Sequence, residues 1–314
     1  GQVIINSMNL NAGAKNVKLL GNGTPGLQYG IRINGSNNFA TYWKATGELE
    51  IAYVEVVGTA AGIEVKHPPG EAYTQNFANL KIHDNYIHDH QLEGMYIGMD
   101  NLSLDVLINA EIYNNIVRNS GNDGIQTRNG TFNIHDNIVD NVALSPAFPY
   151  DINGILVGGN TKNSTIHNNT VSRVPGTAIF NNGWGNHTIT CNVISSTQPG
   201  IFTKNYEFAT EDLQNVGFQN FVIQNNTITS TGGIALQTYY GNNGSSTSTN
   251  FSNNKTSGSV DANYSVTQSN NNINVVPSCS GVPTNTAPTS NAGSDQTITL
   301  PTSSVTLTGS GTDS

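Results

Sequence analysis

Residues 80–92 read "LKIHDNYIHDHQL", and the pattern of this stretch returns along most of the chain. It consists of an apolar residue, any residue, an isoleucine, any residue, a polar residue and an asparagine. Aligned on the asparagine, the copies fall at Asn85, Asn115, Asn137, Asn169, Asn192, Asn226 and Asn254. The intervals between them are 30, 22, 32, 23, 34 and 28 residues. Periods of this length are typical of solenoids, in which each repeat stacks on the next.

The apolar positions within each copy alternate with polar ones, as they do in β-strands. Stacking the copies predicts one interior column, formed by Ile82, Ile112, Ile134, Ile166, Ile189, Ile223 and Phe251. The asparagines then form a second column, in which stacked amides hydrogen-bond along the stack. We therefore expect an all-β fold, a right-handed single-stranded parallel β-helix of about 9–10 coils with an Asn ladder.

A second motif recurs in phase with the first and begins with a glycine followed by an apolar residue. Its copies are "GIRI" (30–33), "GIEV" (62–65), "GMYI" (94–97), "GIQT" (124–127), "GILV" (154–157), "GIFT" (200–203) and "GIAL" (233–236). Many short strands are also typical of a β-sandwich. A sandwich would not explain an asparagine at one phase in seven repeats, so these motifs favour the β-helix.

With these motifs, residues 15–270 resemble the pectate-lyase-like superfamily of right-handed parallel β-helix repeat proteins. The resemblance is specific for the fold. It leaves the activity open, because members of this superfamily include lyases, hydrolases, epimerases, phage tailspikes and adhesins.

The composition narrows the range of partners. Charged residues make up 11% of the chain, and the formal net charge is −9. An acidic protein is a poor partner for nucleic acid or for an anionic membrane surface. It would bind a polyanionic sugar tightly only if Ca²⁺ bridged the two sets of carboxylates. No apolar run approaches the roughly 18 residues that a membrane-spanning helix needs, so we expect no membrane insertion.

We expect three parts in the chain: a parallel β-helix over residues 1–276, a linker rich in Pro, Ser and Thr over 277–290, and a further module over 291–314. The stretch "AGSDQTITLP" (292–301) resembles the first strand of the Ig-like PKD-type modules of secreted bacterial enzymes and adhesins. The resemblance implies a secreted or cell-surface bacterial protein with further Ig-like modules, since 24 residues cannot complete a β-sandwich.

The two ends of the sequence and its two cysteines carry further expectations. Residue 1 falls inside a β-type run, so we expect a signal peptide and earlier coils to precede it, and the chain to continue after Ser314. Cys191 lies in the turn beside Asn192, and Cys279 follows the last coil. The two could pair if the tail folds back along the stack, or they could remain as two free thiols.

Charged residues are scarce in this chain, which makes a cluster of them informative. In the glycine motif, the second residue after Gly should point outward. This pattern predicts an exposed patch over the middle coils, since adjacent coils are about 4.8 Å apart. The patch would contain Glu64, Lys66, Glu93, Tyr96, Asp123, Gln126 and Arg128. Arg32 would occupy the same outward position of the glycine motif in the first coil.

Three interpretations of this patch remain open. Glu93 and Asp123 could be the two carboxyl groups of a retaining glycosidase, roughly 5 Å apart. Alternatively, as the superfamily resemblance implies, Lys66 or Arg128 could be the base of a polysaccharide lyase. Glu64, Glu93 and Asp123 would then bind Ca²⁺ or neutralise the substrate. In the third interpretation the charged residues form ordinary surface ion pairs.

Histidines and aromatic residues add further candidates. His83, His135 and His167 share one outward position, with Tyr113 between them, and we expect these side chains to stack rather than to bind a metal. His90 lies in the turn that leads to Glu93 and could act as a general acid or base. Tyr96 and Gln126, with Trp43 and Tyr150 from the loops, would bind a sugar, since aromatic faces pack against sugar rings.

These observations predict a secreted bacterial β-helix that acts on polysaccharide as a lyase or a glycoside hydrolase. The alternative is a non-catalytic adhesin or structural stalk. An enzyme should carry loops that wall a groove over Glu93 and Asp123, whereas an adhesin should present this face flat and solvated.

Overall fold

A computed structural model describes residues 1–10, 14–23, 25–35, 41–43, 46–66, 77–98, 108–147, 151–158, 161–196, 199–204, 218–230, 233–239, 247–262, 266–279, 289–291 and 310–312. The secondary structure of these described residues consists of β-strands. None of the described segments is a helix with the length and apolar character to cross a membrane.

The described residues of the first 278 positions form three parallel sheets of ten strands each. Sheet A contains β1 (Val3–Ile5), β4 (Ile31–Asn34), β7 (Val54–Val57), β10 (Tyr86–His90), β13 (Ile116–Ser120), β16 (Ile138–Asp140), β19 (Thr170–Val174), β22 (Val193–Ser196), β25 (Thr227–Ser230) and β28 (Lys255–Thr256).

Sheet B contains β2 (Met8–Leu10), β5 (Thr41–Trp43), β8 (Ile63–Val65), β11 (Met95–Ile97), β14 (Ile125–Arg128), β17 (Ile155–Gly158), β20 (Ile179–Asn181), β23 (Ile201–Lys204), β26 (Ile234–Tyr239) and β29 (Ser259–Ala262). Sheet C contains β3 (Lys15–Leu20), β6 (Thr46–Ala52), β9 (Phe77–His83), β12 (Ile108–Tyr113), β15 (Gly130–His135), β18 (Lys162–His167), β21 (Trp184–Thr190), β24 (Gln219–Gln224), β27 (Thr247–Ser252) and β30 (Val266–Ser269).

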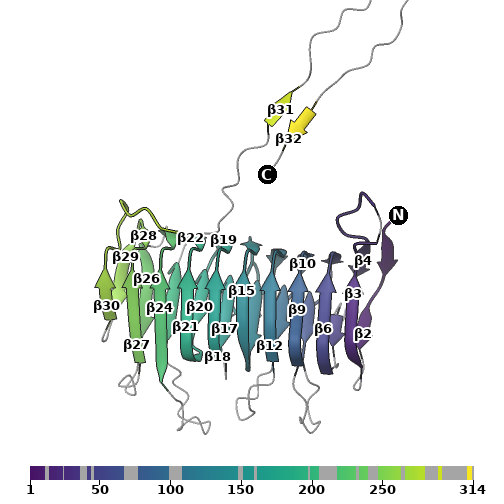
Figure 1. Ribbon diagram of the computed structural model, residues 1–314, viewed down its shortest axis with the longest axis horizontal. Helices are drawn as coiled ribbons and strands as arrows, with labels where there is room; N and C mark the ends of the chain where they lie inside the picture. The colour runs from purple at the N-terminus through teal and green to yellow at the C-terminus, as the bar shows by residue number, and fades with distance from the viewer. Residues whose placement is uncertain are drawn as a thin grey trace, which may run out of the picture. The chain divides into compact units, whose positions relative to one another are not determined.

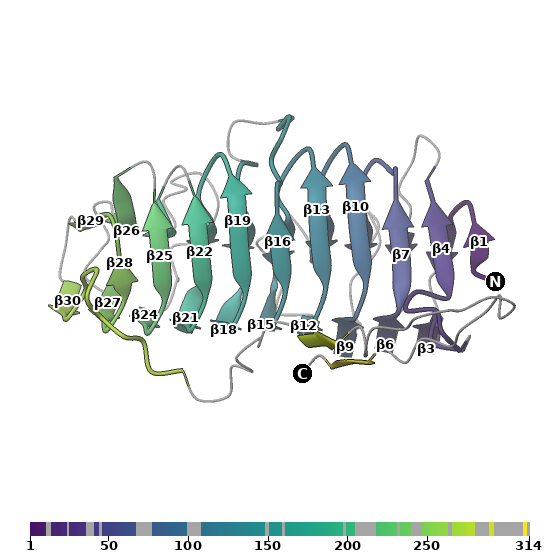
Figure 2. The same ribbon diagram turned by 90° about the horizontal axis from the view of Figure 1, so that it is seen from above.

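The chain visits the sheets in the fixed order A, B, C, and each strand pairs with the strand three elements later. Each round of three strands is therefore one coil, and successive coils lie side by side (Figure 1 and Figure 2). This is the parallel β-helix predicted from the repeats, with ten strands in each sheet.

The asparagines at the turns from sheet C to sheet A form a continuous hydrogen-bonded column. Each side-chain amide donates to the amide oxygen of the next coil, as in Asn85 to Asn115 (3.0 Å) and Asn115 to Asn137 (3.0 Å). The same oxygen also accepts a hydrogen bond from the backbone N–H of the preceding asparagine. For example, Oδ1 of Asn137 lies 3.0 Å from the backbone nitrogen of Asn115. The amide donates again to a backbone carbonyl of the preceding coil, from Asn85 to Ile51 at 2.9 Å. The column runs to Asn254 and ends on Asn271.

The residue before each ladder asparagine explains the second polar position of the motif. Its backbone is left-handed, with φ between 53° and 58° in Asp84, Asn114, Asp136, Asn168, Cys191, Asn225 and Asn253. Asp and Asn tolerate this conformation better than other non-glycine residues, because their short side chains hydrogen-bond locally. The "DN" and "NN" pairs therefore encode the turn.

The predicted interior column is confirmed. Ile82, Ile112, Ile134, Ile166, Ile189, Ile223 and Phe251 pair in register and are fully buried. Equivalent columns of sheets A and B, such as Val56–Ile87–Val117, complete a single core. Because each coil buries its apolar residues against the next, the stability of a solenoid accumulates along the stack.

The recurrent glycine lies where the chain turns from sheet A to sheet B. A Cβ on Gly62 would lie 2.1 Å from the carbonyl oxygen of Gly94, and one on Gly94 would lie 2.7 Å from that of Gly124. The coils approach so closely here that a side chain would collide with the next backbone.

One copy of the glycine motif was assigned to the wrong sheet. Residues 31–34 form β4 of sheet A, where Arg32 pairs with Glu55 in register and by an ion pair of 2.9 Å. The sheet B strand of that coil is β5 instead. Arg32 therefore does not belong to the outward column of Glu64. The motif misled because "GIRI" has the same apolar alternation in either sheet.

The chain divides into two compact units, Gly1–Ser278 and Cys279–Ser314. The β-helix forms the first. In the second, β31 (Thr289–Asn291) pairs antiparallel with β32 (Ser310–Thr312). Cys191 and Cys279 are each disulfide-bonded, and the described residues contain no free thiol. The assignment of residues 291–314 to a PKD-type module stays a prediction.

The ladder generates a stability prediction. Replacing Asn137 by Ala would remove the acceptor of the buried backbone N–H of Asn115, one acceptor of its side-chain amide, and a donor to the carbonyl of Ile112. Each such group costs roughly 1–3 kcal/mol. We expect the Asn137→Ala variant to lose about 3 kcal/mol or more of unfolding free energy in urea titration.

The control is Asn220→Ala, since Asn220 makes its hydrogen bonds on the surface of sheet C. We expect it to lose about 0.5 kcal/mol or less. Equal losses in the two variants would contradict the proposed contribution of the ladder.

Candidate functional site

The outward column of sheet B has the predicted register but not the predicted exposure. Glu64, Tyr96, Gln126 and Leu156 align on successive strands, and their relative exposures are 1%, 6%, 3% and 6%. The expectation of an open, exposed patch is therefore wrong for this column. Its side chains point away from the core of the coils yet are shielded from solvent.

Glu64, Lys66 and Tyr96 form one cluster on this covered face. The ammonium of Lys66 lies 2.6 Å from Oε1 of Glu64 and 3.5 Å from the centre of the Tyr96 ring. A buried carboxylate is costly unless it is paired, and a cation over an aromatic face is favourable. The three side chains therefore hold one another in a fixed arrangement, with the Lys66 side chain 24% exposed.

Arg128 joins the same face from β14. With its amide oriented to satisfy both groups, Gln126 accepts hydrogen bonds from Nε and Nη2 of Arg128, at 2.9 and 3.1 Å. Lys66 and Arg128 each follow a residue that pairs with Ile97, so they share one column and lie two strands apart. That spacing corresponds to roughly 10 Å. Two cations thus flank the strand that carries Tyr96.

Glu93 and Asp123 lie on adjacent coils, as predicted, but in the turn from sheet A to sheet B and largely out of solvent. The N–H of Gly94 donates to the Asp123 carbonyl, which fixes this neighbourhood. Their exposures are 8% and 0%. Oδ1 of Asp123 accepts from the backbone N–H (2.6 Å) and the side-chain amide (3.1 Å) of Asn153. Its Oδ2 has no hydrogen-bond partner within the described part of the chain.

A third carboxylate, Asp151, belongs to this turn and was not predicted. The amide of Asn122 links it to Glu93, with distances of 3.5 Å to Asp151 and 3.1 Å to Glu93. Burial raises the pKa of Asp123, and the charges of Asp151 and Glu93 raise it further, against the hydrogen bond from the Asn153 backbone. Asp151 lies outside both repeated motifs, so only the folded coil brings it here.

His90 is the last residue of β10, not part of the turn, and it is buried. It is 4% exposed, and its Nδ1 lies 2.6 Å from Oγ1 of Thr59. Burial lowers its pKa to about 4, so its imidazole is neutral at neutral pH. With this exposure in the described structure, His90 is not placed to contact a substrate as a general acid or base.

The remaining predicted residues are placed as follows. Trp43 lies in β5, where its backbone pairs in register with Val65. Tyr150 lies outside the described residues. The described residues contain no group of three or more His, Cys, Asp or Glu side chains with the geometry for a metal ion. Glu64, Glu93 and Asp123 are therefore not gathered into the Ca²⁺ site considered from the sequence.

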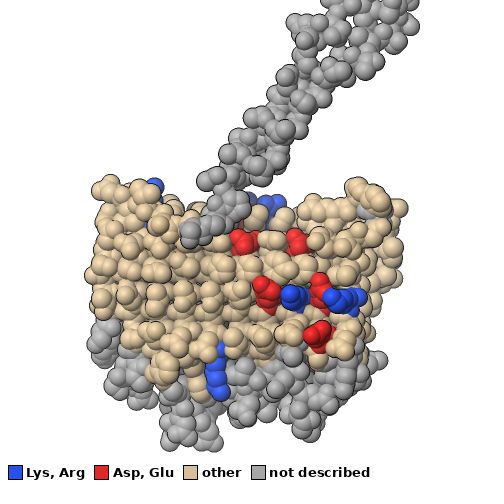
Figure 3. All heavy atoms as spheres, in the orientation of Figure 1, with Lys and Arg blue, Asp and Glu red and all other residues tan. Residues whose placement is uncertain are grey.

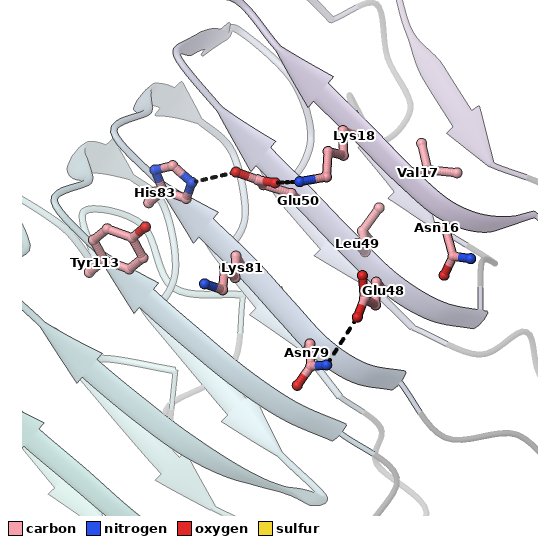
Figure 4. A pocket seen from close by; sticks show the side chains of 10 residues that line it. All are labelled: Asn16, Val17, Lys18, Glu48, Leu49, Glu50, Asn79, Lys81, His83 and Tyr113. Carbon is pink, nitrogen blue, oxygen red and sulfur yellow. Dashed lines mark hydrogen bonds and ion pairs between the residues drawn. The ribbon is translucent and has the colours of Figure 1, made fainter.

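A second cluster lies on the outward face of sheet C. The predicted stacking of its histidines is confirmed, with ring centres 4.6 Å apart for His83–Tyr113, 5.1 Å for Tyr113–His135 and 4.7 Å for His135–His167. The first two rings of this stack, His83 and Tyr113, border a depression of about 500 Å³ (Figure 4). This depression could not be predicted from the sequence, because its charged residues come from separate strands and meet only through the register of sheet C.

The raised pKa of Asp123 predicts a pH effect on stability. The folded protein binds the proton of Asp123 more tightly than the unfolded chain does. The stability that this protonated carboxyl contributes is fully present at pH values below the ordinary pKa of an aspartate. The contribution is lost as pH rises through the folded pKa. The Asp123→Asn variant, which is neutral at every pH, should therefore gain melting temperature relative to wild type as pH rises from 4 to 9. A relative gain of 1 kcal/mol corresponds to roughly 2–4 °C in chains of 150–250 residues.

The exposed Asp261→Asn substitution serves as the control. If the melting temperatures of wild type and Asp123→Asn differ by the same amount at every pH in this range, Asp123 does not hold a proton in the folded protein.

The chain was compared with known families, curated proteins and solved structures. The family described as "Right handed beta helix region" matches residues 3–194. No curated protein sequence matches the chain. The structure of XylC in complex with xylose is 14% identical with a TM-score of 0.42. That alignment covers 72% of this chain and 38% of XylC, so this chain spans about 38% of that protein's length.

Two solved structures from Azotobacter vinelandii are similar over more of their length. The A-module of mannuronan C-5 epimerase AlgE6 is 15% identical, with a TM-score of 0.43, and the alignment covers 84% of this chain and 79% of that one. The A-module of AlgE4 is 14% identical, with a TM-score of 0.42 and coverage of 86% and 90%. The family match extends over more than half of the 314 residues. The chain therefore belongs to the family of proteins with a right-handed β-helix region.

Proposed function

We propose that this protein is a polysaccharide-cleaving β-helix of the lyase type, and that sheet B carries its active site. The proposed site residues are Glu64, Lys66, Tyr96, Gln126 and Arg128. The protein is proposed to act outside the cell on a polysaccharide that contains uronic acids.

One observation carries this proposal: the change in character along a single column. Glu64, Tyr96 and Gln126 occupy it over β8, β11 and β14, whereas Leu156, Phe180 and Phe202 follow over β17, β20 and β23. Leu156, Phe180 and Phe202 are what we expect at such positions when the side chains serve packing alone. Withdrawing the carboxylate of Glu64 from water is costly, and such groups are concentrated at functional sites.

The chemistry of β-elimination suits two cations beside a carboxylate. In this reaction the proton on C5 of a uronate leaves, the C4–O4 bond breaks, and a C4=C5 double bond forms. Negative charge builds up on the uronate carboxyl group during proton removal. In our proposal Arg128 neutralises this charge. Lys66 first gives a proton to Glu64, which lies 2.6 Å away, and its neutral amine then takes the C5 proton as general base and returns it to the leaving oxygen. Glu64 then gives its proton back and restores the ammonium of Lys66.

Lys66 and Arg128 also explain how an acidic protein could bind a polyanionic sugar. The chain as a whole is acidic, with a net charge of −9. Lys66 and Arg128 nevertheless give this face of sheet B two positive groups about 10 Å apart, with Tyr96 on the strand between them. Glu93 and Asp123, the pair considered for a hydrolase, are buried in the turn and hydrogen-bonded to Asn122 and Asn153.

The test compares products from uronic and neutral polysaccharides, with Ca²⁺ or with EDTA. We expect reducing ends together with absorbance of unsaturated uronates near ~235 nm. The Lys66→Met variant should lose activity by roughly 100-fold or more, as expected when a group that stabilises the transition state is removed.

The matched control is Lys204→Met. Lys204 occupies the same column on β23 and lies 5.4 Å from the ring centre of Tyr239, so it reproduces the cation–aromatic contact away from the site. It should keep activity within about 2-fold, as expected for a surface change.

Two results would contradict the proposal. Reducing ends without unsaturated product would identify a hydrolase. No product from any polysaccharide would favour the adhesin or stalk, whose coils serve only as a scaffold.

A further inference from the structure

The depression on sheet C lies on a different face from the proposed active site. It extends over β3, β6, β9 and β12 (Figure 4), and its volume of about 500 Å³ falls within the range of small-molecule sites. Figure 3 shows that the charged side chains of this view gather over one part of the face, with a broad uncharged part beside them. The later strands of the same column carry Asn133, Thr165 and Thr188.

Alternating charges run through the depression. Lys18, Glu50, Lys81 and Glu111 align on successive strands of sheet C. Nζ of Lys18 lies 2.5 Å from Oε2 of Glu50, whose other oxygen lies 3.2 Å from Nε2 of His83. The hydrogen bond from Lys18 is the main cause that lowers the pKa of Glu50. This carboxylate is thus ionised and held in one orientation.

Beside this network, several polar groups keep hydrogen-bonding capacity for a ligand. The hydroxyl of Tyr113 makes no hydrogen bond with the described residues, and burial raises its pKa, so it remains a donor. Nζ of Lys81 lies 3.7 Å from Glu111, too far for a hydrogen bond. Glu48 accepts one bond, from Asn79 at 3.2 Å. Acceptors therefore line the β6 side of the depression, and donors line the β9 and β12 side.

We propose that this depression binds a neutral oligosaccharide. A sugar hydroxyl both donates and accepts, and so it can bridge the carboxylates on β6 and the donors on β9 and β12. The lining carries Glu48 and Glu50 against Lys18 and Lys81, so it offers no excess of positive charge to a polyanion. The site is separate from the cluster on sheet B and does not depend on the proposed lyase activity. It would hold a neutral part of a glycan while the sheet B site acts elsewhere.

Isothermal titration with cellohexaose, mannohexaose and laminarihexaose tests the proposal. We expect at least one of these probes to bind, and Tyr113→Phe and Lys81→Met each to weaken its Kd about 3- to 10-fold, as expected for one lost hydrogen bond. Thr188→Ala, in the same column as Lys81 but outside the depression, should leave the Kd unchanged. Melting curves establish that each variant is folded.

The same titrations in the Lys66→Met background separate the two sites, because binding at sheet C should persist there with the same Kd. Failure of all three probes to bind would overturn the proposal, as would an unchanged Kd in both Tyr113→Phe and Lys81→Met. A galacturonate hexamer that bound as tightly as the neutral probes would overturn the assignment to a neutral sugar.

Discussion

The hydrogen-bonded column of asparagines is the constraint on which the rest of this structure depends. Each amide joins its own turn to the next coil and to a carbonyl of the preceding coil, as Asn115 does with Asn137 and Ile82. Because a buried polar group must be satisfied, the ladder fixes the phase at which each coil from Asn85 to Asn254 enters sheet A. The phase of the coils in turn aligns the residues of sheets B and C into columns. Both proposed sites are segments of such columns.

The sequence was informative where one residue type recurs at one phase. The asparagines, the isoleucine column and the stacked rings of His83, Tyr113 and His135 could all be predicted, because the local pattern and the long-range contact coincide. The glycine motif was reliable from Gly62 onward but failed at Gly30, since the alternation around Arg32 fits sheet A equally well.

The site was harder to predict than the fold. Register placed Glu64, Tyr96 and Gln126 in one column correctly, but their burial depends on whatever covers the sheet, and a repeat pattern carries no information about it. Asp151 comes close to Asp123 only through the path of a connection outside the repeats. The alternating charges of Lys18, Glu50 and Lys81 come from three coils and emerge only once the register is known.

The most direct test of the central claim asks whether a polysaccharide contacts the sheet B cluster. Reductive methylation of lysines, followed by mass spectrometry, measures the modification rate of Lys66 and of Lys204 with and without a uronic polysaccharide. If sheet B carries the active site, the polysaccharide should slow modification of Lys66 and leave Lys204 unaffected. An unchanged rate at Lys66 under conditions in which the polysaccharide is bound would contradict the account.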